Sequence, residues 1–551
     1  YDGAGGAENV AVGNDALIVN AGNNNVAVGG DSMKANTTGA ANVAVGYAAL
    51  AANTTASDNT AIGFEALEAN TTGAGLTGIG RKALEANTTA SNNTAVGYKA
   101  MIANTTGASN VAVGSNALDA NTTAANNVAV GHNALTANTT GASNVSVGFE
   151  SLKANTTGAS NIGIGTGALE ANTTASYNVG IGHDAMLSNT TGAQNTAVGY
   201  AALDAATTGN YLTAIGHNAL GANTTAGNNT SVGWNSMLAN TTGENNIAMG
   251  YKALAANTTA SNNTALGFEA LVANTTGAGN TAIGKDAMIA NTTANDCTAI
   301  GLDALTANTT GSNNIAVGGM AMATNTTGQF NVAVGESALR YATTASSNTG
   351  VGANALQAST TGADNTAVGY GCLDTVTTGS DNTAVGKNVD ADATGAASRL
   401  GFGGSLTLTT NSQVRIGVST NFVYNNFASN ATWTHSSDER LKENIKDDVL
   451  GLSFINYLRP VTYSWKKQID VPKEIRSDRE KDTDVKQHGM LAQEVKAALD
   501  KVGVDTFAGW SEEKDGIQMI SEEMFVFPLI KAIQELSAEV EQLKSKAHDK
   551  C

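Results

Sequence analysis

A 17-residue repeat organises most of this 551-residue chain. Its clearest marker is a glycine, preceded in most copies by Val or Ile, that recurs at Gly29 and then every 17 residues to Gly386. Gly13 adds one copy 16 residues earlier, which makes 23 markers, and the consensus reads N-[TVI]-A-[VI]-G-x-x-A-[LM]-x-A-N-T-T-[GA]-A-x. A unit this short cannot bury a core alone, so we expect each copy to stack on its neighbours as one rung of a β-solenoid.

Within one repeat the pattern predicts a strand, an interior column and a turn. Alternation in segment 93–96 (Asn-Thr-Ala-Val) places Thr and Val on one face and Asn and Ala on the other. Leu or Met stands four residues after the marker glycine in every copy from Leu17 to Leu373, so this column is expected inside. Segment 103–107 (Ala-Asn-Thr-Thr-Gly) predicts a turn in which Asn or Gly takes a positive φ.

Composition fits stacked backbone better than globular packing. The chain has 62 Gly and 3 Pro, and residues 1–436 hold no Pro, as expected where each backbone N–H bonds to the next rung. At about 4.8 Å per rung, such a stack predicts a rod on the order of 100 Å long.

An asparagine stands four residues before the marker glycine in 20 of the 23 copies, and Leu76, Leu212 and Cys297 replace it in the others. A position that accepts Asn, Leu or Cys is expected to be buried, with the amides bonded to one another in a ladder. The alternative interpretation is that this Asn simply begins a turn.

Charge and cysteine content exclude several classes of function. The net charge is −18, with 11 Lys and Arg against 24 Asp and Glu in residues 1–435, and no basic patch suggests a nucleic-acid partner. No stretch is apolar enough for membrane insertion. Cys297, Cys372 and Cys551 have neither disulfide nor metal spacing, and we expect no metal and no cofactor. Because the sequence opens at Tyr1 without Met, a preceding segment that attaches the protein to a larger assembly is expected.

The repeat N-[TV]-A-[VI]-G-x-x-A resembles the head repeats of trimeric autotransporter adhesins over roughly residues 5–390. That resemblance implies β-rolls wound around a three-fold axis, hence a parallel homotrimer, although the repeat of this chain departs from the family in its turn. The Asn-Thr-Thr-Gly arrays are also similar to those of phage tail fibres and bacterial surface fibres.

Three regions are predicted from the change of character along the chain. Residues 1–390 form the repeat solenoid, residues 391–435 a neck of short strands, and residues 436–551 an α+β domain. Charge rises in the last region, all three Pro occur there, and helical periodicity is found at 490–501 and 525–546.

Three segments of the last region resemble the endosialidase-type intramolecular chaperone family, the self-cleaving serine peptidases at the ends of phage tailspikes and fibres. They are 436–445 (Ser-Ser-Asp-Glu-Arg-Leu-Lys-Glu-Asn-Ile), 489–495 (Gly-Met-Leu-Ala-Gln-Glu-Val) and 528–536 (Pro-Leu-Ile-Lys-Ala-Ile-Gln-Glu-Leu). The resemblance implies a domain that assembles the fibre and then cuts itself off.

The same resemblance implies a Ser–Lys dyad, with Ser437 as nucleophile, Lys442 as base and the bond Ser436–Ser437 as the cleavage site. The chemistry is sound, because a serine hydroxyl needs a neighbouring base and a partly buried lysine can be neutral enough to serve. The alternative is a helix-capping box from Ser436 to Glu439, with Lys442 a solvated side chain.

The last helix carries an a/d rhythm typical of a short coiled coil, which predicts a trimerisation seam at Leu529, Ile533, Leu536, Val540 and Leu543. The alternative is an amphipathic helix that packs on its own domain.

The residue after the marker glycine is aromatic in nine copies. If this column faces outward, it would stack on sugars, with Tyr98, Tyr200, Trp234 and Tyr251 as candidate ligand-binding residues. The alternative, which we favour, is contact between rungs or subunits.

Together these patterns predict an extracellular homotrimeric fibre that attaches to a receptor on a host or target cell, with a glycan as one candidate receptor, as a viral tail fibre does. A bacterial cell-surface adhesive fibre with the same chaperone is the alternative, and an ice-binding solenoid is a weaker one. The body suggests no enzyme, whereas the C-terminal domain is expected to act once, as an autoprotease.

Overall fold

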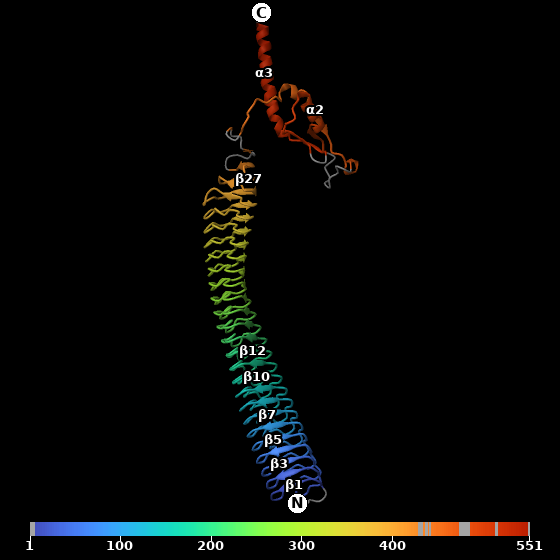
Figure 1. Cartoon of the computed structure of the whole chain (residues 1–551). Coiled ribbons are helices and arrows are strands. Elements are labelled where there is room, and N and C mark those ends of the chain that lie inside the picture. Colours follow the sequence, from blue (N-terminus) through green and yellow to red (C-terminus); the bar gives the residue numbers. More distant parts are fainter. Residues whose placement is uncertain are drawn as a thin grey trace. The chain divides into compact units, whose positions relative to one another are not determined.

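The computed structural model describes residues 6–427, 434–435, 439, 442–472, 485–512 and 516–548. The chain divides into two compact units, residues 1–436 and 437–551. The first unit is a parallel β-solenoid of about 24 turns with a 17-residue repeat (Figure 1), as predicted from the sequence.

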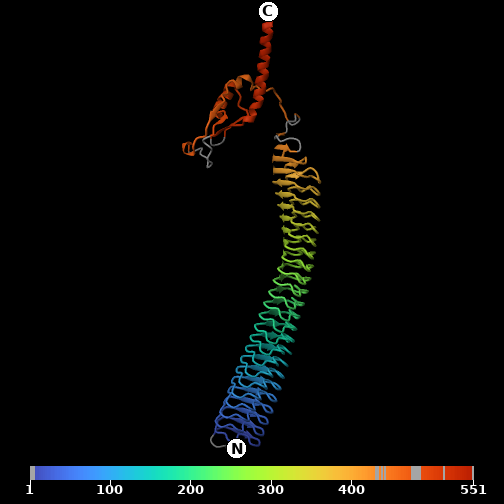
Figure 2. The same cartoon turned by 180° about the vertical axis from the view of Figure 1, so that it is seen from behind.

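Each of the first 23 turns contributes one three-residue strand, and these strands line one side of the rod in both views (Figures 1 and 2). In chain order they are β1 (Val10–Val12), β2 (Val26–Val28), β3 (Val43–Val45), β4 (Thr60–Ile62), β5 (Thr77–Ile79), β6 (Thr94–Val96), β7 (Val111–Val113), β8 (Val128–Val130), β9 (Val145–Val147), β10 (Ile162–Ile164), β11 (Val179–Ile181), β12 (Thr196–Val198), β13 (Thr213–Ile215), β14 (Thr230–Val232), β15 (Ile247–Met249), β16 (Thr264–Leu266), β17 (Thr281–Ile283), β18 (Thr298–Ile300), β19 (Ile315–Val317), β20 (Val332–Val334), β21 (Thr349–Val351), β22 (Thr366–Val368) and β23 (Thr383–Val385).

Consecutive strands pair in parallel with equivalent residues opposite each other, as β6 does with β7. The middle residue of a strand, such as Ala95, is fully buried, whereas Thr94 and Val96 on either side are only half-buried and point out. The predicted alternation is therefore confirmed, and the small middle residue is the one that faces the interior.

The interior column of Leu and Met is confirmed, and its backbone explains why no copy carries Val or Ile there. Leu50 and Met101 are fully buried and have φ angles of 51° and 53°, and the rest of the column has similar values. A β-branched side chain is strongly disfavoured in this left-handed region. The column thus selects apolar side chains that branch no earlier than Cγ.

The marker glycine is required by both backbone and space. Gly97 has a φ of 144°, and a Cβ added there would lie 2.4 Å from the carbonyl oxygen of Gly114 in the next turn. Any other residue would push neighbouring turns apart, so the glycine fixes the close approach of the backbone.

Two columns of buried asparagines bond the turns together. Asn42, of the column before the strand, donates from its backbone N–H to Asn25 Oδ1 at 3.0 Å and from Nδ2 to the carbonyl of Ala56 at 2.9 Å. Asn53, of the Asn-Thr-Thr column, donates from Nδ2 to Asn36 Oδ1 at 2.8 Å and to the same Ala56 carbonyl at 3.0 Å. Burial of the first column is confirmed, and it excludes the simple turn interpretation.

The Asn-Thr-Thr segment differs from the prediction. It was expected to turn through a positive φ at Asn or Gly, yet neither Asn104 nor Gly107 has one, and Asn104 is fully buried. The more continuous amide-to-amide ladder runs through this column rather than the one predicted, as the bond from Asn104 Nδ2 to Asn87 Oδ1 at 3.0 Å illustrates. The sharp bends lie elsewhere, at Leu, at the residue two before it, and at the residue that precedes the strand asparagine.

Substitutions in these columns have visible consequences. Ala206 and Ala342 replace Asn and leave Oδ1 of Asn189 and of Asn325 without a hydrogen-bond partner in the described chain. Cys297 is buried with its Sγ 3.3 Å from the carbonyl of Gly311, and burial raises the pKa of its thiol. It therefore serves as a small interior residue, as expected.

The solenoid does not end near residue 390, where the period was expected to fail. Strand β25 (Leu400–Gly404) pairs in parallel with β23, and β27 (Gln413–Val418) pairs in parallel with β25. The antiparallel strands β28 (Asn421–Asn426) and β29 (Thr434–His435) then follow, and a separate parallel pair is formed by β24 (Asp390–Ala391) and β26 (Thr407–Leu408). The sequence did not predict this continuation, because the consensus residues of the repeat are replaced after residue 390 while the parallel strand pairing goes on.

Arg399 terminates the first asparagine column. It stands 17 residues after Asn382, at the position of the next asparagine. Its backbone N–H donates to Asn382 Oδ1 at 3.1 Å, as the backbone N–H of an asparagine in this column does. Its side chain is almost fully buried, donating to Asp392 at 2.7 Å, to Asn411 at 3.1 Å and to the carbonyl of Leu408. The guanidinium thus finds three acceptors of its own, which compensates for its burial at a position that asparagine holds in most other copies.

The second unit is a small α+β domain. Its elements are α1 (Leu452–Ile455), β30 (Val461–Tyr463), η2 (Gln468–Asp470), β31 (Gln487–Gly489), α2 (Ala492–Val502), β32 (Trp510–Glu512), β33 (Gln518–Ile520), η4 (Glu522–Phe525) and α3 (Val526–His548). Strands β30 and β31 form one antiparallel pair, and β32 and β33 form another. Helices α2 and α3 confirm the two predicted helical segments.

We predict that Leu254→Ile destabilises the solenoid more than Leu254→Met, although both replacements keep the side chain apolar and similar in size. Volume-conserving swaps usually cost less than about 1.5 kcal/mol. The β-branch adds roughly 1–3 kcal/mol of backbone strain at the left-handed φ of 54°. Thermal unfolding of the full chain, followed by circular dichroism at one protein concentration, measures the difference, and equal midpoints would refute this account of the column.

We predict that Asp374→Asn stabilises the protein at pH 8 more than at pH 4. Burial and the adjacent Asp390 carboxylate raise the pKa of Asp374 from 3.8 to about 6. Protonated Asp374 is thus favoured in the fold, and this stabilisation is fully present below about pH 4 and is lost as pH rises through 6, where the Asp374 carboxylate forms next to that of Asp390. Melting temperatures of wild type and variant at the two pH values test this, and a pH-independent difference would contradict it.

Candidate functional site

The proposed cleavage segment is only partly described. Ser436 and Ser437 lie outside the described residues, so the dyad of Ser437 and Lys442 stays a prediction. The backbone N–H of Lys442 donates to the carbonyl of Glu439 at 3.0 Å, and its side chain is exposed. Residues 442–449 are exposed coil, and Leu450 is the first buried residue among those described in the second unit. The candidate base therefore stands on the surface of a single chain.

A compact apolar core lies directly after this segment. Phe454 in α1 is fully buried, and its ring meets Phe507 at 5.7 Å and Phe525 at 6.3 Å between centroids. Val495 and Leu499 of α2 complete the same cluster. This core connects the exposed coil of residues 442–449 to helices α2 and α3 through α1.

One glutamate from each of the motif segments 489–495 and 528–536 forms hydrogen bonds with another part of the second unit. Glu494, in α2, accepts two hydrogen bonds from the guanidinium of Arg459, which lower the pKa of that carboxyl. Glu535, in α3, accepts a hydrogen bond of 2.6 Å from the backbone N–H of Leu452. Next to it, a Cβ added at Gly451 would lie 2.3 Å from a carboxylate oxygen of Glu535. These motif residues thus position the chain just after the predicted dyad.

Helix α3 presents the predicted seam to solvent. In the single chain the five side chains are 41–66% exposed, and they are Leu529, Ile533, Leu536, Val540 and Leu543. The buried residues of α3 are instead Pro528 and Ala532. The alternative, that this stripe packs on its own domain, is therefore wrong, while its role as a trimer seam stays a prediction.

The aromatic column faces outward, and its rings stack on one another along the rod. Tyr200, His217, Trp234, Tyr251 and Phe268 follow in consecutive turns, with centroids 4.9–6.2 Å apart and planes within 23° of parallel. Each ring face inside this run is covered by its neighbour, so a sugar would meet only ring edges. Contact between turns is thus shown for this run.

Tyr98 is the one candidate ligand-binding residue of the column outside this run. It is 43% exposed and has the ammonium of Lys99 5.4 Å from its ring centroid. A ligand role for Tyr98, Tyr200, Trp234 and Tyr251 stays a prediction, and the geometry favours hydrogen bonding by ring edges over face-on stacking.

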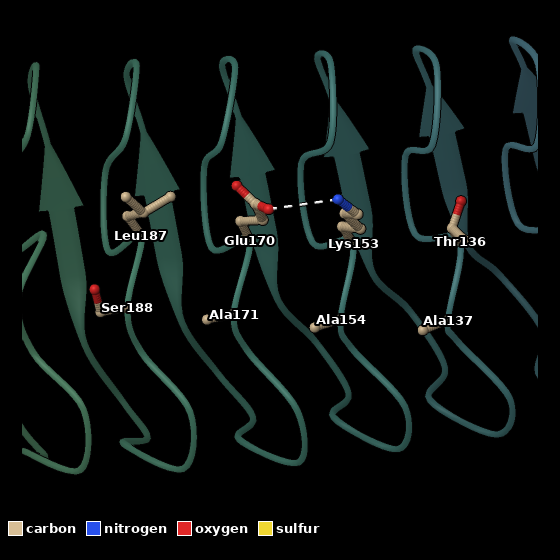
Figure 3. A pocket seen from close by; sticks show the side chains of 8 residues that line it. All are labelled: Thr136, Ala137, Lys153, Ala154, Glu170, Ala171, Leu187 and Ser188. Atoms are coloured by element: carbon tan, nitrogen blue, oxygen red, sulfur yellow. Dashed lines mark ion pairs between the residues drawn. The ribbon is translucent and has the colours of Figure 1, made fainter.

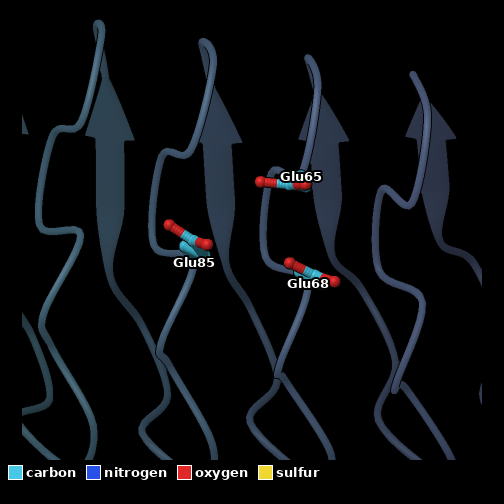
Figure 4. A group of neighbouring side chains, drawn as sticks. All are labelled: Glu65, Glu68 and Glu85. Carbon is cyan, nitrogen blue, oxygen red and sulfur yellow. The ribbon is translucent and has the colours of Figure 1, made fainter.

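One acidic cluster was not foreseen, because its members come from two turns. Carboxylate oxygens of Glu65, Glu68 and Glu85 lie within 4.8 Å of one another (Figure 4). Lys82 donates to Glu65 at 2.9 Å and to Glu85 at 2.8 Å, so the cluster is an ion-pair network with its own cation. Burial and the neighbouring carboxylates raise the pKa of Glu68.

A shallow groove of about 740 Å³ crosses four turns next to the interior column (Figure 3). Its floor is formed by Ala137, Ala154 and Ala171, and Lys153 pairs with Glu170 across it at 3.6 Å. The groove arises because alanines recur at one position of successive repeats here, and it holds no convergent set of polar groups.

The comparisons with known proteins bear on the second unit. A family model described as chaperone of endosialidase matches residues 437–504, which confirms the family resemblance found in the C-terminal region. No curated protein matches the chain. Among the helices of the described ranges, none combines the length and apolar character needed to cross a membrane.

We predict that Leu536→Asp prevents assembly, because it places a charge in the middle of the exposed stripe. Ser537→Asp, one residue further along α3, adds the same charge outside the stripe and serves as the matched control. Native mass measurement of both full-length variants checks this. Assembly that is equally impaired in both variants, or in neither, would argue against the seam.

Proposed function

We propose that this protein is a homotrimeric attachment fibre, which its own C-terminal unit assembles and then leaves by cutting the chain before Ser437. The observation that carries the proposal is the presence in one chain of a uniform solenoid of about 24 turns and a region matched by the chaperone of endosialidase model. Their combination fits a fibre assembled by a chaperone domain.

The uniformity of the solenoid creates the need for such a domain. Neighbouring turns are nearly identical, so three chains could align in register or slip by whole turns at similar energy. A distinct unit at one end sets the alignment once, and the turns then pair from that end. This supports a separate assembly unit on a fibre of this kind.

The exposed position of Lys442 supports cleavage after assembly rather than before it. A lysine must be shielded from water to be neutral and act as a base. Lys442 is exposed in the single chain. Packing of three C-terminal units would supply the missing burial, so that only correctly assembled fibres are cut.

The chemistry of the cut balances without a cofactor. Ser437 Oγ attacks the carbonyl carbon of Ser436 as Lys442 takes the hydroxyl proton, and the Ser436–Ser437 amide nitrogen leaves with a proton. Water then hydrolyses the resulting ester. The products are a fibre that ends at Ser436 and a fragment of residues 437–551. Removal of the assembly unit makes refolding differ from unfolding, so the fibre persists kinetically.

The attachment role rests on the rod-like solenoid and its exposed aromatic edges. We assign the fibre to the outside of a virion or a bacterial cell, where it would contact a receptor, including a glycan. The Thr-Thr columns favour ice binding less, because the first threonine of each pair uses its hydroxyl on the next turn, as Thr88 does on the carbonyl of Thr105 at 3.2 Å.

We predict that Ser437→Ala and Lys442→Ala both give uncut chains that still form trimers, since assembly and cleavage depend on different residues. Wild type should yield the two products that meet at the Ser436–Ser437 bond. Denaturing gels with mass spectrometry measure the cut, and native mass measures assembly.

Lys446→Ala is a suitable control, because it removes an exposed lysine from the same coil without touching the predicted dyad. Cutting before residue 437 in the Ser437→Ala variant would eliminate this nucleophile. A monomeric wild-type chain with an intact C-terminus would overturn the trimer.

A further inference from the structure

One face of the solenoid carries two rows of uncharged side chains along its whole length, one row aliphatic or Met throughout and the other shared by Val, Ile and Thr. The first residue of every strand from β1 to β23 is Val, Ile or Thr, and the third is Val, Ile, Leu or Met. Both point away from the interior, and several of the third residues are more than a third exposed, such as Ile215 at 40% and Leu266 at 44%. We call these two columns the strand face.

Charges avoid the strand face completely. In residues 9–388 every Lys, Arg, Asp and Glu stands one, two or five residues after a marker glycine, or five or six residues before one. The second threonine of the Asn-Thr-Thr segments, such as Thr225, forms another exposed column without charge, which we call the threonine surface. Of these two uncharged surfaces, the strand face is the more apolar, because the third residue of each of its strands is aliphatic or Met.

The size of the strand face is that of a protein interface. Twenty-three strands at about 4.8 Å make a strip on the order of 110 Å long, and two outward residues along each strand span about 7 Å. The strip thus covers roughly 750 Å², close to the ~800 Å² that each partner buries in a stable complex. Isolated apolar patches on monomers are mostly smaller.

We infer that the strand face is the surface through which copies of this chain pack against one another along the fibre body. The inference rests on the proposed homotrimer and adds which side of the solenoid meets the axis. A partner must offer apolar rows at the same spacing over the same length, and a second copy does so row for row. Parallel chains in register then bring each strand next to its own equivalent.

The columns beside the strand face agree with this placement. The position directly after the marker glycine holds the aromatic run, but also Arg81, Lys285 and Lys387, whose charges need solvent. This column therefore forms the rim of the interface, where aromatic edges and a few charges are exposed, while the uncharged strand face forms its centre.

Site-directed cross-linking tests the inference on the full-length chain. Val232→Cys places a thiol in the third position of β14, and Thr225→Cys places one on the threonine surface. Both variants carry Cys551→Ser, while Cys297 and Cys372 are buried and stay. A short bismaleimide should convert most Val232→Cys chains into covalent dimers on a denaturing gel and leave Thr225→Cys chains single.

A second pair, Ile181→Cys and Thr174→Cys, repeats the comparison three turns away, and circular dichroism confirms that each variant folds. Trimers in which the strand-face cysteines stay unlinked would overturn the inference, and linking at the threonine surface would do so as well. Both results leave the trimer itself standing. A monomeric native mass for wild type would instead defeat the proposed function from which the inference starts.

Discussion

The structure depends on the parallel hydrogen bonding of each turn to the next, with equivalent residues in register. A single turn buries almost nothing, so its backbone N–H groups, its asparagine amides and its interior Leu or Met are satisfied only by the turns above and below. The residue type is therefore nearly constant at repeat positions whose side chain or backbone contacts the neighbouring turn. It varies at positions that face solvent.

This constraint explains the unusual chemistry of the interior. A globular core avoids rows of buried amides, whereas here each asparagine of Asn42 type finds both an acceptor from its own turn and a backbone donor from the next. The pattern continues to Asn382, whose Oδ1 still accepts a hydrogen bond from a backbone N–H, that of Arg399. Arg399 itself is buried in place of an asparagine, and its guanidinium binds three acceptors of its own.

The sequence predicted the solenoid, its period, the interior column and the two C-terminal helices, because each is marked by a residue type that recurs at a fixed spacing. It failed where the residue type at a repeat position did not reveal the structural role of that position. Asn104 has turn-like neighbours but lies in the interior, since an amide ladder is not distinguishable from a turn in a single repeat. The turns after residue 390 were missed because Arg399 does not resemble the asparagine it replaces.

The candidate site was predictable to a different degree. The exposed stripe on α3 follows from heptad spacing alone, and its role as a seam stays a prediction. The predicted dyad of Ser437 and Lys442 came from family resemblance, and no local pattern distinguishes it from a helix cap. The roles of Glu494 and Glu535 could not be foreseen, because each acts on a residue distant in sequence, Arg459 and Leu452. The acidic cluster around Lys82 likewise appears only when two turns are superposed.

The way in which each turn contacts only its neighbours has a consequence for how such a fibre changes over generations. A duplicated or deleted stretch of 51 nucleotides would add or remove one whole turn, join the remaining turns without a misfit, and leave the turn of Arg399 and the C-terminal unit untouched. Reach could thus vary in increments of about 4.8 Å at little risk to folding. Longer and shorter fibres could thus share the same interior, the same closing turns and the same C-terminal unit.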